Sequence, residues 1–221
     1  MPAIEEKIAL GTVYGDHSEV ESAVSALTDQ RLGHVPVVGL DGPNDLVQIL
    51  ASVDGWKLIG VSILSIYGSG IVSEAGKDTW KAIAPKIKIA PAALQAKFLQ
   101  LVHSLQKEQA NGQDVSIGLI EPTFDSHGRR DRVYIKDLSP EELARHLYIF
   151  SHCVHPVSSW LSEVYAAQTQ RGEVFVSMHI TDEGTLVVEL EPGYGKTSLP
   201  LGVSKKVFNA QGTIIEEKRN S

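Results

Sequence analysis

The spacing of apolar residues changes along this chain of 221 residues, and from Gly172 onward apolar and polar residues alternate. Four apolar residues occupy every second position there: Val174, Val176, Met178 and Ile180. Because the side chains of a strand point to its two faces in turn, these four would share one face. The sequence TDEG (181–184) is typical of a tight turn, and a Gly turn divides the strand-like segment 205–217. The C-terminal part therefore predicts an antiparallel β-meander.

The N-terminal part combines two kinds of pattern. It is strand-like at 8–15 and 34–42 and helical at 16–33 and 43–53. One face of the first helix would carry Val20, Ala23, Val24 and Leu27. Ser18 and Glu21 have capping-box spacing, which predicts Ser18 as the N-cap, and Pro43 suits the first turn of the second helix. This β-α-β-α order is compatible with a parallel strand pair and a crossover, while an α+β sheet is equally allowed.

Residues 58–73 are the most apolar stretch, with no charged residue between Lys57 and Glu74. A spanning helix needs roughly 20 apolar residues, so this segment is too short to favour membrane insertion. Four small residues would let another element approach closely: Gly60, Ser65, Gly68 and Ser69. The stretch is therefore interpreted as a packed helix or an oligomer interface.

The remaining patterns complete an α+β fold class. A helix is predicted over 91–112 and ends at Asn111-Gly112, and strands follow at 114–122 and 132–138. Another helix starts with Ser139 as its N-cap, and Pro156 should break it before a further helix resumes. The expected architecture is an N-terminal α/β-like segment, a helical middle and a C-terminal antiparallel meander flanked by helices. Two prolines near 85–91 suggest a boundary between units 1–88 and 89–221.

Charge and cysteine content narrow the class of protein. Residues 1–55 hold two basic and nine acidic residues, and so carry the whole net charge of −7. Because nucleic-acid binding depends on clustered Lys and Arg, no nucleic-acid partner is predicted. The lone Cys153 excludes internal disulfides and fits a reducing compartment, and the first residues lack the pattern of a signal peptide. A cytoplasmic protein is expected.

Gly195-Lys196-Thr197 has the last letters of a phosphate-binding loop. Such a loop needs a glycine five residues before Gly195, where this chain has Leu190, and a helix beginning at the Lys-Thr end. Pro200 stands where that helix would run. The segment is therefore predicted to be a turn between two strands.

The densest group of metal-capable side chains is His146, His152, Cys153 and His155. On a helix His152 and His155 could face the same side, but Cys153 would point elsewhere. The favoured interpretation is a helix end whose histidines bind backbone carbonyls while Cys153 packs in the core. No metal and no cofactor is predicted.

The loop 124–132 gathers Arg129, Arg130 and Arg132 around His127. Arginines bind phosphate or carboxylate through paired donors, and histidine can transfer protons. The interleaved aspartates, Asp125 and Asp131, favour a solvated hairpin tip instead.

Two function hypotheses remain, because the motifs of nucleophilic and dinucleotide-binding sites are missing from the sequence. The first is a non-catalytic binding or regulatory protein that acts through protein–protein contacts, with a protein partner or self-association. The alternative is an enzyme acting on a phosphorylated or carboxylated small molecule, which would use the 125–132 loop and His127 or His152.

Overall fold

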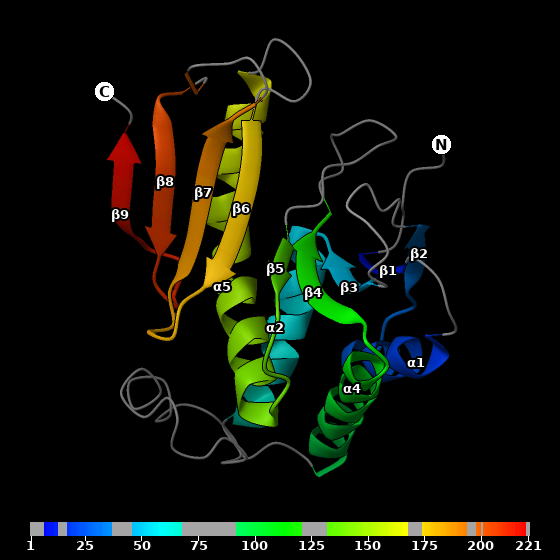
Figure 1. The fold of residues 1–221 in the computed structure, drawn as a ribbon. Coiled ribbons are helices and arrows are strands. Elements are labelled where there is room, and N and C mark those ends of the chain that lie inside the picture. Colours follow the sequence, from blue (N-terminus) through cyan, green and yellow to red (C-terminus); the bar gives the residue numbers. More distant parts are fainter. Residues whose placement is uncertain are drawn as a thin grey trace.

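The computed structural model describes residues 7–12, 17–36, 46–67, 92–120, 132–167, 174–193, 198–199 and 201–219. Among these residues, four helices and two sheets form a mixed α+β fold, which confirms the predicted fold class. Figure 1 shows the two sheets side by side, with the longest helix behind the C-terminal sheet and continuing below it.

Sheet A has five strands in the spatial order β2-β1-β3-β4-β5. They are β1 (Ile8–Thr12), β2 (Gly33–Pro36), β3 (Leu46–Ala51), β4 (Asp114–Leu119) and β5 (Arg132–Tyr134). The β1–β2 and β3–β4 pairs are parallel, whereas β1–β3 and β4–β5 are antiparallel. The N-terminal β-α-β pattern thus forms a parallel pair inside a mixed sheet. Because β3 pairs with β4, strands from both sides of residue 88 share this sheet.

Sheet B is the antiparallel meander that the alternating C-terminal pattern predicts. Its strands are β6 (Val174–Ile180), β7 (Leu186–Pro192), β8 (Val203–Phe208) and β9 (Ile214–Arg219), in that spatial order. The 181–184 turn is confirmed by Gly184, whose N–H donates to the carbonyl of Thr181. The chain passes from β7 into the antiparallel strand β8, so no helix follows the Gly195-Lys196-Thr197 segment within the described residues.

The helices are α1 (Ser18–Thr28), α2 (Val53–Tyr67), α4 (Ala92–Ala110) and α5 (Pro140–Ala166). α1 packs on α4, α2 packs on α5, and α5 also contacts β7 of sheet B. The α2–α5 contact includes Trp56, whose ring lies 4.7 Å from the Phe150 ring in an edge-to-face arrangement. Its indole Nε1 also donates to the Gly118 carbonyl of β4 at 2.9 Å, so one side chain ties α2 to both α5 and sheet A. No described helix has the length and hydropathy needed to cross a membrane.

Two elements differ in kind from the sequence prediction. Residues 46–51 form strand β3 instead of the expected helix over 43–53. A short apolar run that is buried on both faces carries no alternating signal, so it looks the same for a central strand and a buried helix. The predicted break at Pro156 is also wrong, because α5 continues through this residue. The Ser139 cap is confirmed, since its hydroxyl accepts the Glu142 N–H.

The α1 cap differs by one residue from the predicted capping box. His17 occupies the N-cap position, and its side chain makes no capping hydrogen bond. The four residues predicted for the apolar face of α1 are all buried: Val20, Ala23, Val24 and Leu27. The periodicity therefore located the helix correctly, but His17 at its start contacts another helix instead of capping α1.

One face of sheet A carries an unusual polar pair. Gln48 and Ser116 are direct partners in the β3–β4 register, so their side chains lie on the same face. The neighbouring positions Val47 and Ile49 belong to the core formed with the helices, so Gln48 faces away from that core. Both polar residues are completely buried, yet their side-chain N and O atoms have no hydrogen-bond partner within the described part of the chain.

We expect Gln48→Met to raise the free energy of unfolding by about 1–2 kcal/mol, because a buried amide without partners costs roughly 1–3 kcal/mol and methionine has a similar volume. Urea unfolding followed by circular dichroism would measure the change. The control is Gln100→Met at an exposed position of α4, where we expect a change below about 0.5 kcal/mol. A loss of stability in Gln48→Met alone would show that the amide is satisfied in solution.

Candidate functional site

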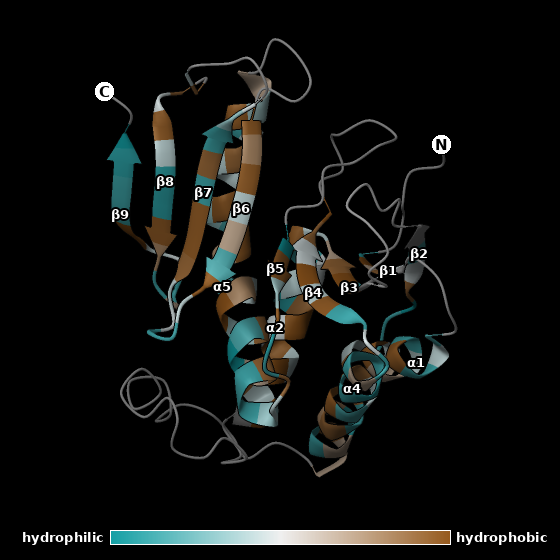
Figure 2. Cartoon of the chain, viewed as in Figure 1, coloured by the Kyte–Doolittle hydropathy of each residue, from teal (hydrophilic) through white to brown (hydrophobic). Residues whose placement is uncertain are grey.

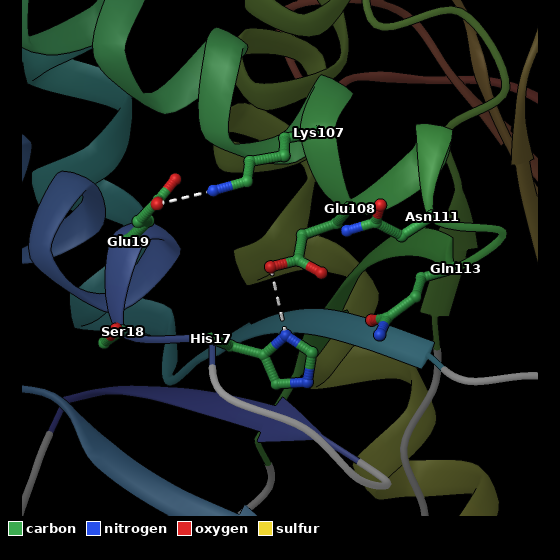
Figure 3. A pocket seen from close by; sticks show the side chains of 7 residues that line it. All are labelled: His17, Ser18, Glu19, Lys107, Glu108, Asn111 and Gln113. Carbon is green, nitrogen blue, oxygen red and sulfur yellow. Dashed lines mark hydrogen bonds and ion pairs between the residues drawn. The ribbon is translucent and has the colours of Figure 1, made fainter.

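A cavity of about 290 Å³ lies where the first turn of α1 meets the last turns of α4. We call it the polar pocket, because every residue that lines it is polar or charged: His17, Ser18, Glu19, Lys107, Glu108, Asn111 and Gln113 (Figure 3). Its volume is close to the lower end of the range of small-molecule sites. The pocket thus has the size for a small metabolite and a lining suited to hydrogen bonds.

The pocket is positioned by the packing of α1 on α4. Val20 and Val24 of α1 are buried, as are Leu101 and Leu105 of α4, and all four belong to the same apolar core. This contact fixes the start of α1 beside the end of α4. His17, at the N-cap of α1, is thereby held against α4.

At the end of α4 the chain turns back through a Schellman motif. The N–H of Gln113 donates to the Glu108 carbonyl at 3.1 Å, and that of Gly112 donates to the Gln109 carbonyl at 3.0 Å. Gly112 has φ +87°, a conformation that a glycine adopts without strain. The predicted helix end at Asn111-Gly112 is therefore confirmed, and the motif brings Gln113 back to the pocket wall.

His17 and Glu108 form a buried pair at the base of the pocket. His17 Nδ1 lies 3.2 Å from Glu108 Oε1, and the side chains are only 4% and 10% exposed. A buried carboxylate is costly unless a donor or a positive charge compensates it. This contact orients the imidazole ring, in the way that a carboxylate orients a histidine that transfers protons.

A second ion pair lies at the rim. Lys107 Nζ is 2.6 Å from Glu19 Oε1, and both side chains are mostly exposed. Because the pair is solvated, we expect it to contribute little to stability, and a ligand could compete for either partner. Figure 3 shows this pair on the α1 side of the pocket, with Asn111 and Gln113 on the opposite side.

Gln113 supplies a buried acceptor. Its Oε1 atom is shielded from solvent and has no hydrogen-bond partner among the residues that the structure describes. Such an atom costs free energy until a donor reaches it. The wall of the polar pocket therefore includes one acceptor that no described residue satisfies.

The residues predicted as metal candidates lie along α5 but do not converge. His146 Nδ1 and His152 Nδ1 contact the carbonyls of Glu142 and Tyr148, and Cys153 Sγ donates to the Asn209 carbonyl. His155 is exposed. Within the described ranges there is no group of three or more possible metal ligands. Burial lowers the pKa of His146, which favours its neutral form.

Cys153 is held in the core, and burial raises the pKa of its thiol to about 12. Because the thiolate is the reactive form, we expect alkylation by iodoacetamide at pH 8 to be about a hundredfold slower than for a free cysteine. Mass spectrometry over a time course would measure it. The same protein unfolded in urea is the control and should react at the ordinary rate. Equal rates in both states would contradict the buried position of Cys153.

Other sequence candidates are placed as follows. Arg132 lies in β5, where its guanidinium carbon is 5.1 Å from the centre of the Tyr134 ring. Gly60 packs against Ser151 of α5, and the Ser65 hydroxyl donates to the Val61 carbonyl within α2. Five candidates lie outside the described residues: Gly68, Ser69, His127, Arg129 and Arg130.

No protein-family model, curated protein or solved structure matches this chain.

The sequence contains two signals for the polar pocket, although neither residue is among the predicted site residues. Glu108 follows Leu101 and Leu105 on the buried stripe of α4, where a carboxylate needs a partner. His17 directly precedes the periodic residues of α1 but belongs to no preferred capping type. Neither signal identifies the other residue, because the two are distant in the sequence.

Proposed function

We propose that the protein is a non-catalytic binding or regulatory protein and that a small polar molecule occupies the polar pocket. The buried His17–Glu108 pair beneath an entirely polar lining carries this proposal. Proteins avoid burying charge without need, since an apolar pair of the same volume is often at least as stable. Stability alone does not require a buried charged pair at this position, whereas binding of a ligand would explain it.

The same proposal includes contact with a protein partner, for which strand β9 is the best-suited surface. β9 is one of the two edge strands of sheet B, and all six of its residues are exposed. Ile214 and Ile215 are 44% and 57% exposed, ahead of a charged run that is teal in Figure 2. An edge strand can accept an added strand from another chain, and the charges restrict which chain fits.

Binding can be tested with untagged protein and a panel of small polar metabolites, by isothermal calorimetry. We expect at least one compound to bind, and Glu108→Gln to weaken it by about tenfold or more, because the carboxylate becomes a neutral amide. Glu183→Gln, in the exposed β6–β7 turn, is the matched control and should bind normally. If no compound binds, or if both variants bind equally, the pocket is not the functional site.

The alternative is an enzyme acting on a phosphorylated or carboxylated small molecule. The specific observation in its favour is the orientation of His17 by Glu108, which suits a general acid or base. This role replaces the one assigned to His127 or His152 by the sequence. Incubating the protein with each bound compound and recovering it for mass spectrometry separates the two proposals. Unchanged compound supports binding, and a product that disappears in His17→Gln supports catalysis.

A further inference from the structure

Strand β9 offers a sheet edge to which no other described strand is added, and the inference drawn from it rests on its proposed contact with a protein partner. The two sheets have four edge strands: β2, β5, β6 and β9. β5 and β6 lie against each other. β2 has four residues and ends at Pro36, which has no N–H to donate. β9 has six residues, pairs only with β8 within the described part of the chain, and lies at the outer side of sheet B in Figure 1.

This edge has the groups that strand pairing uses. Every second residue of an edge strand directs its N–H and C=O groups away from the sheet. Ile214 and Ile215 are 44% and 57% exposed, and such apolar side chains lose contact with water when a strand is added beside them. The edge therefore supplies both backbone hydrogen bonds and apolar surface to a partner strand.

The charges of β9 show which strand fits. Lys218 lies directly opposite Lys205 of β8, and like charges in direct opposition are unfavourable. No acidic side chain of the described residues lies within ion-pair distance of Lys218. Glu216 Oε1 is 3.8 Å from Lys205 Nζ, but the Glu216 side chain is still 59% exposed. β9 thus carries a cation without an acidic partner, two residues after a largely solvated carboxylate.

We infer that a second copy of this chain pairs with β9 in antiparallel orientation, around a twofold axis at Glu217. Directly opposite residues of paired strands lie on the same face of the sheet, so a twofold axis between identical strands passes through a residue position. With the axis at Glu217, Glu216 of each copy lies opposite Lys218 of the other. Both Lys218 side chains of the dimer thereby gain a carboxylate.

The neighbouring arrangements satisfy fewer charges. A parallel pair in register would place Glu216 opposite Glu216 and Lys218 opposite Lys218. An antiparallel pair with its axis at Lys218 would bring the two Lys218 side chains together beside Lys205. With the axis at Glu216, Lys218 would lie opposite Ile214 and still lack an acid. The axis at Glu217 is therefore the favoured register.

The two Glu217 carboxylates that meet at this axis are compensated within their own chains. Glu217 Oε2 lies 3.5 Å from Lys206 Nζ, and Glu217 Oε1 accepts a hydrogen bond from Arg219 Nε at 2.9 Å. Arg219 of the second copy is also the diagonal neighbour of Glu217, within reach of a long side chain. The like charges at the axis are thus surrounded by bases.

Size-exclusion chromatography with light scattering, on the untagged full chain at increasing concentration, should show a monomer–dimer equilibrium. Lys218→Glu would oppose two carboxylates, and we expect it to weaken dimerisation at least about tenfold. Glu216→Lys would oppose two ammonium groups and should have the same effect. Lys136→Glu makes the first charge change at an exposed position after β5, and this control should dimerise like the wild type.

A mixture of Lys218→Glu and Glu216→Lys tests the register. When a dimer contains one copy of each variant, both opposite positions again hold an acid and a base. The mixture should therefore form a dimer that neither variant forms alone, and a chain with both substitutions should dimerise by itself. Because both positions are exposed on an edge strand, the circular dichroism of the variants should match the wild type.

Failure of this inference differs from failure of the proposed function. A wild-type protein that stays monomeric at every concentration overturns the inference, and so does a dimer that Lys218→Glu leaves intact. If a metabolite binds such a monomer in a Glu108-dependent way, the proposed pocket function stands. If the monomer contacts an unrelated protein and Lys218→Glu abolishes that contact, the second copy is the wrong occupant of β9. If the protein neither dimerises nor binds any metabolite, both proposals fail.

Discussion

Replacing Trp56 by alanine should lower the free energy of unfolding by about 3–5 kcal/mol, the usual range for removing a large buried aromatic side chain. Trp56 is completely buried and contacts Phe150 of α5. Its indole N–H donates to the Gly118 carbonyl of sheet A. The substitution therefore opens a cavity at the point where α2, α5 and sheet A meet, and it also removes a buried hydrogen bond.

Urea unfolding followed by circular dichroism would measure the loss. Val61→Ala in the same helix is the control, because Val61 is 64% exposed and its loss should cost less than about 1 kcal/mol. Trp56→Phe keeps an aromatic ring but removes the hydrogen bond. We expect it to lower the free energy of unfolding by about 1–3 kcal/mol, from the unpaired Gly118 carbonyl and the smaller ring together. If Trp56→Ala cost no more than Val61→Ala, the junction of α2 with α5 would not be part of the cooperative core.

The elements that the sequence predicted correctly have one exposed and one buried side. α4 spans residues 92–110 with Phe98, Leu101 and Leu105 buried on one face, and β6 alternates as expected. Periodicity reports such elements directly, because burial on one side forces the pattern. The prediction for β3 was wrong for the opposite reason: residues 47–51 are buried on both faces, so the strand has no pattern to read.

The sequence did not predict that α5 continues through Pro156 or that the polar pocket forms, because both depend on contacts with residues distant in the sequence. A proline inside a helix costs a hydrogen bond locally, and only tertiary packing decides whether the helix continues. Here the 209–213 turn packs on α5 at that position. His17 and Glu108 likewise become a pair only when α1 packs on α4. Local patterns located both helices, but the site itself is a property of their contact.

The packing of that turn on α5 depends on Gly212. Pro156 has no N–H, so the His152 carbonyl lacks its usual helical donor. Gly212 lies directly against this carbonyl, and a Cβ there would overlap its oxygen and contact the Pro156 ring. Nearby, Cys153 Sγ donates to the Asn209 carbonyl at 3.3 Å. The β8–β9 turn thus covers the site where proline interrupts the hydrogen bonds of α5.

Gly212→Ala should accordingly lower the free energy of unfolding by about 2–5 kcal/mol. Its φ of +77° costs an L-residue about 1–2 kcal/mol, and forcing the turn away from α5 adds roughly 1–3 kcal/mol of overpacking. Gly202→Ala is the matched control, because Gly202 has φ +65° with nothing near its Cβ position, and only the first cost applies. Urea unfolding of both variants would give the difference. If both variants lost the same free energy of unfolding, the turn would not need its close contact with α5. A larger loss in Gly212→Ala would show that the β8–β9 hairpin stabilises α5 at Pro156.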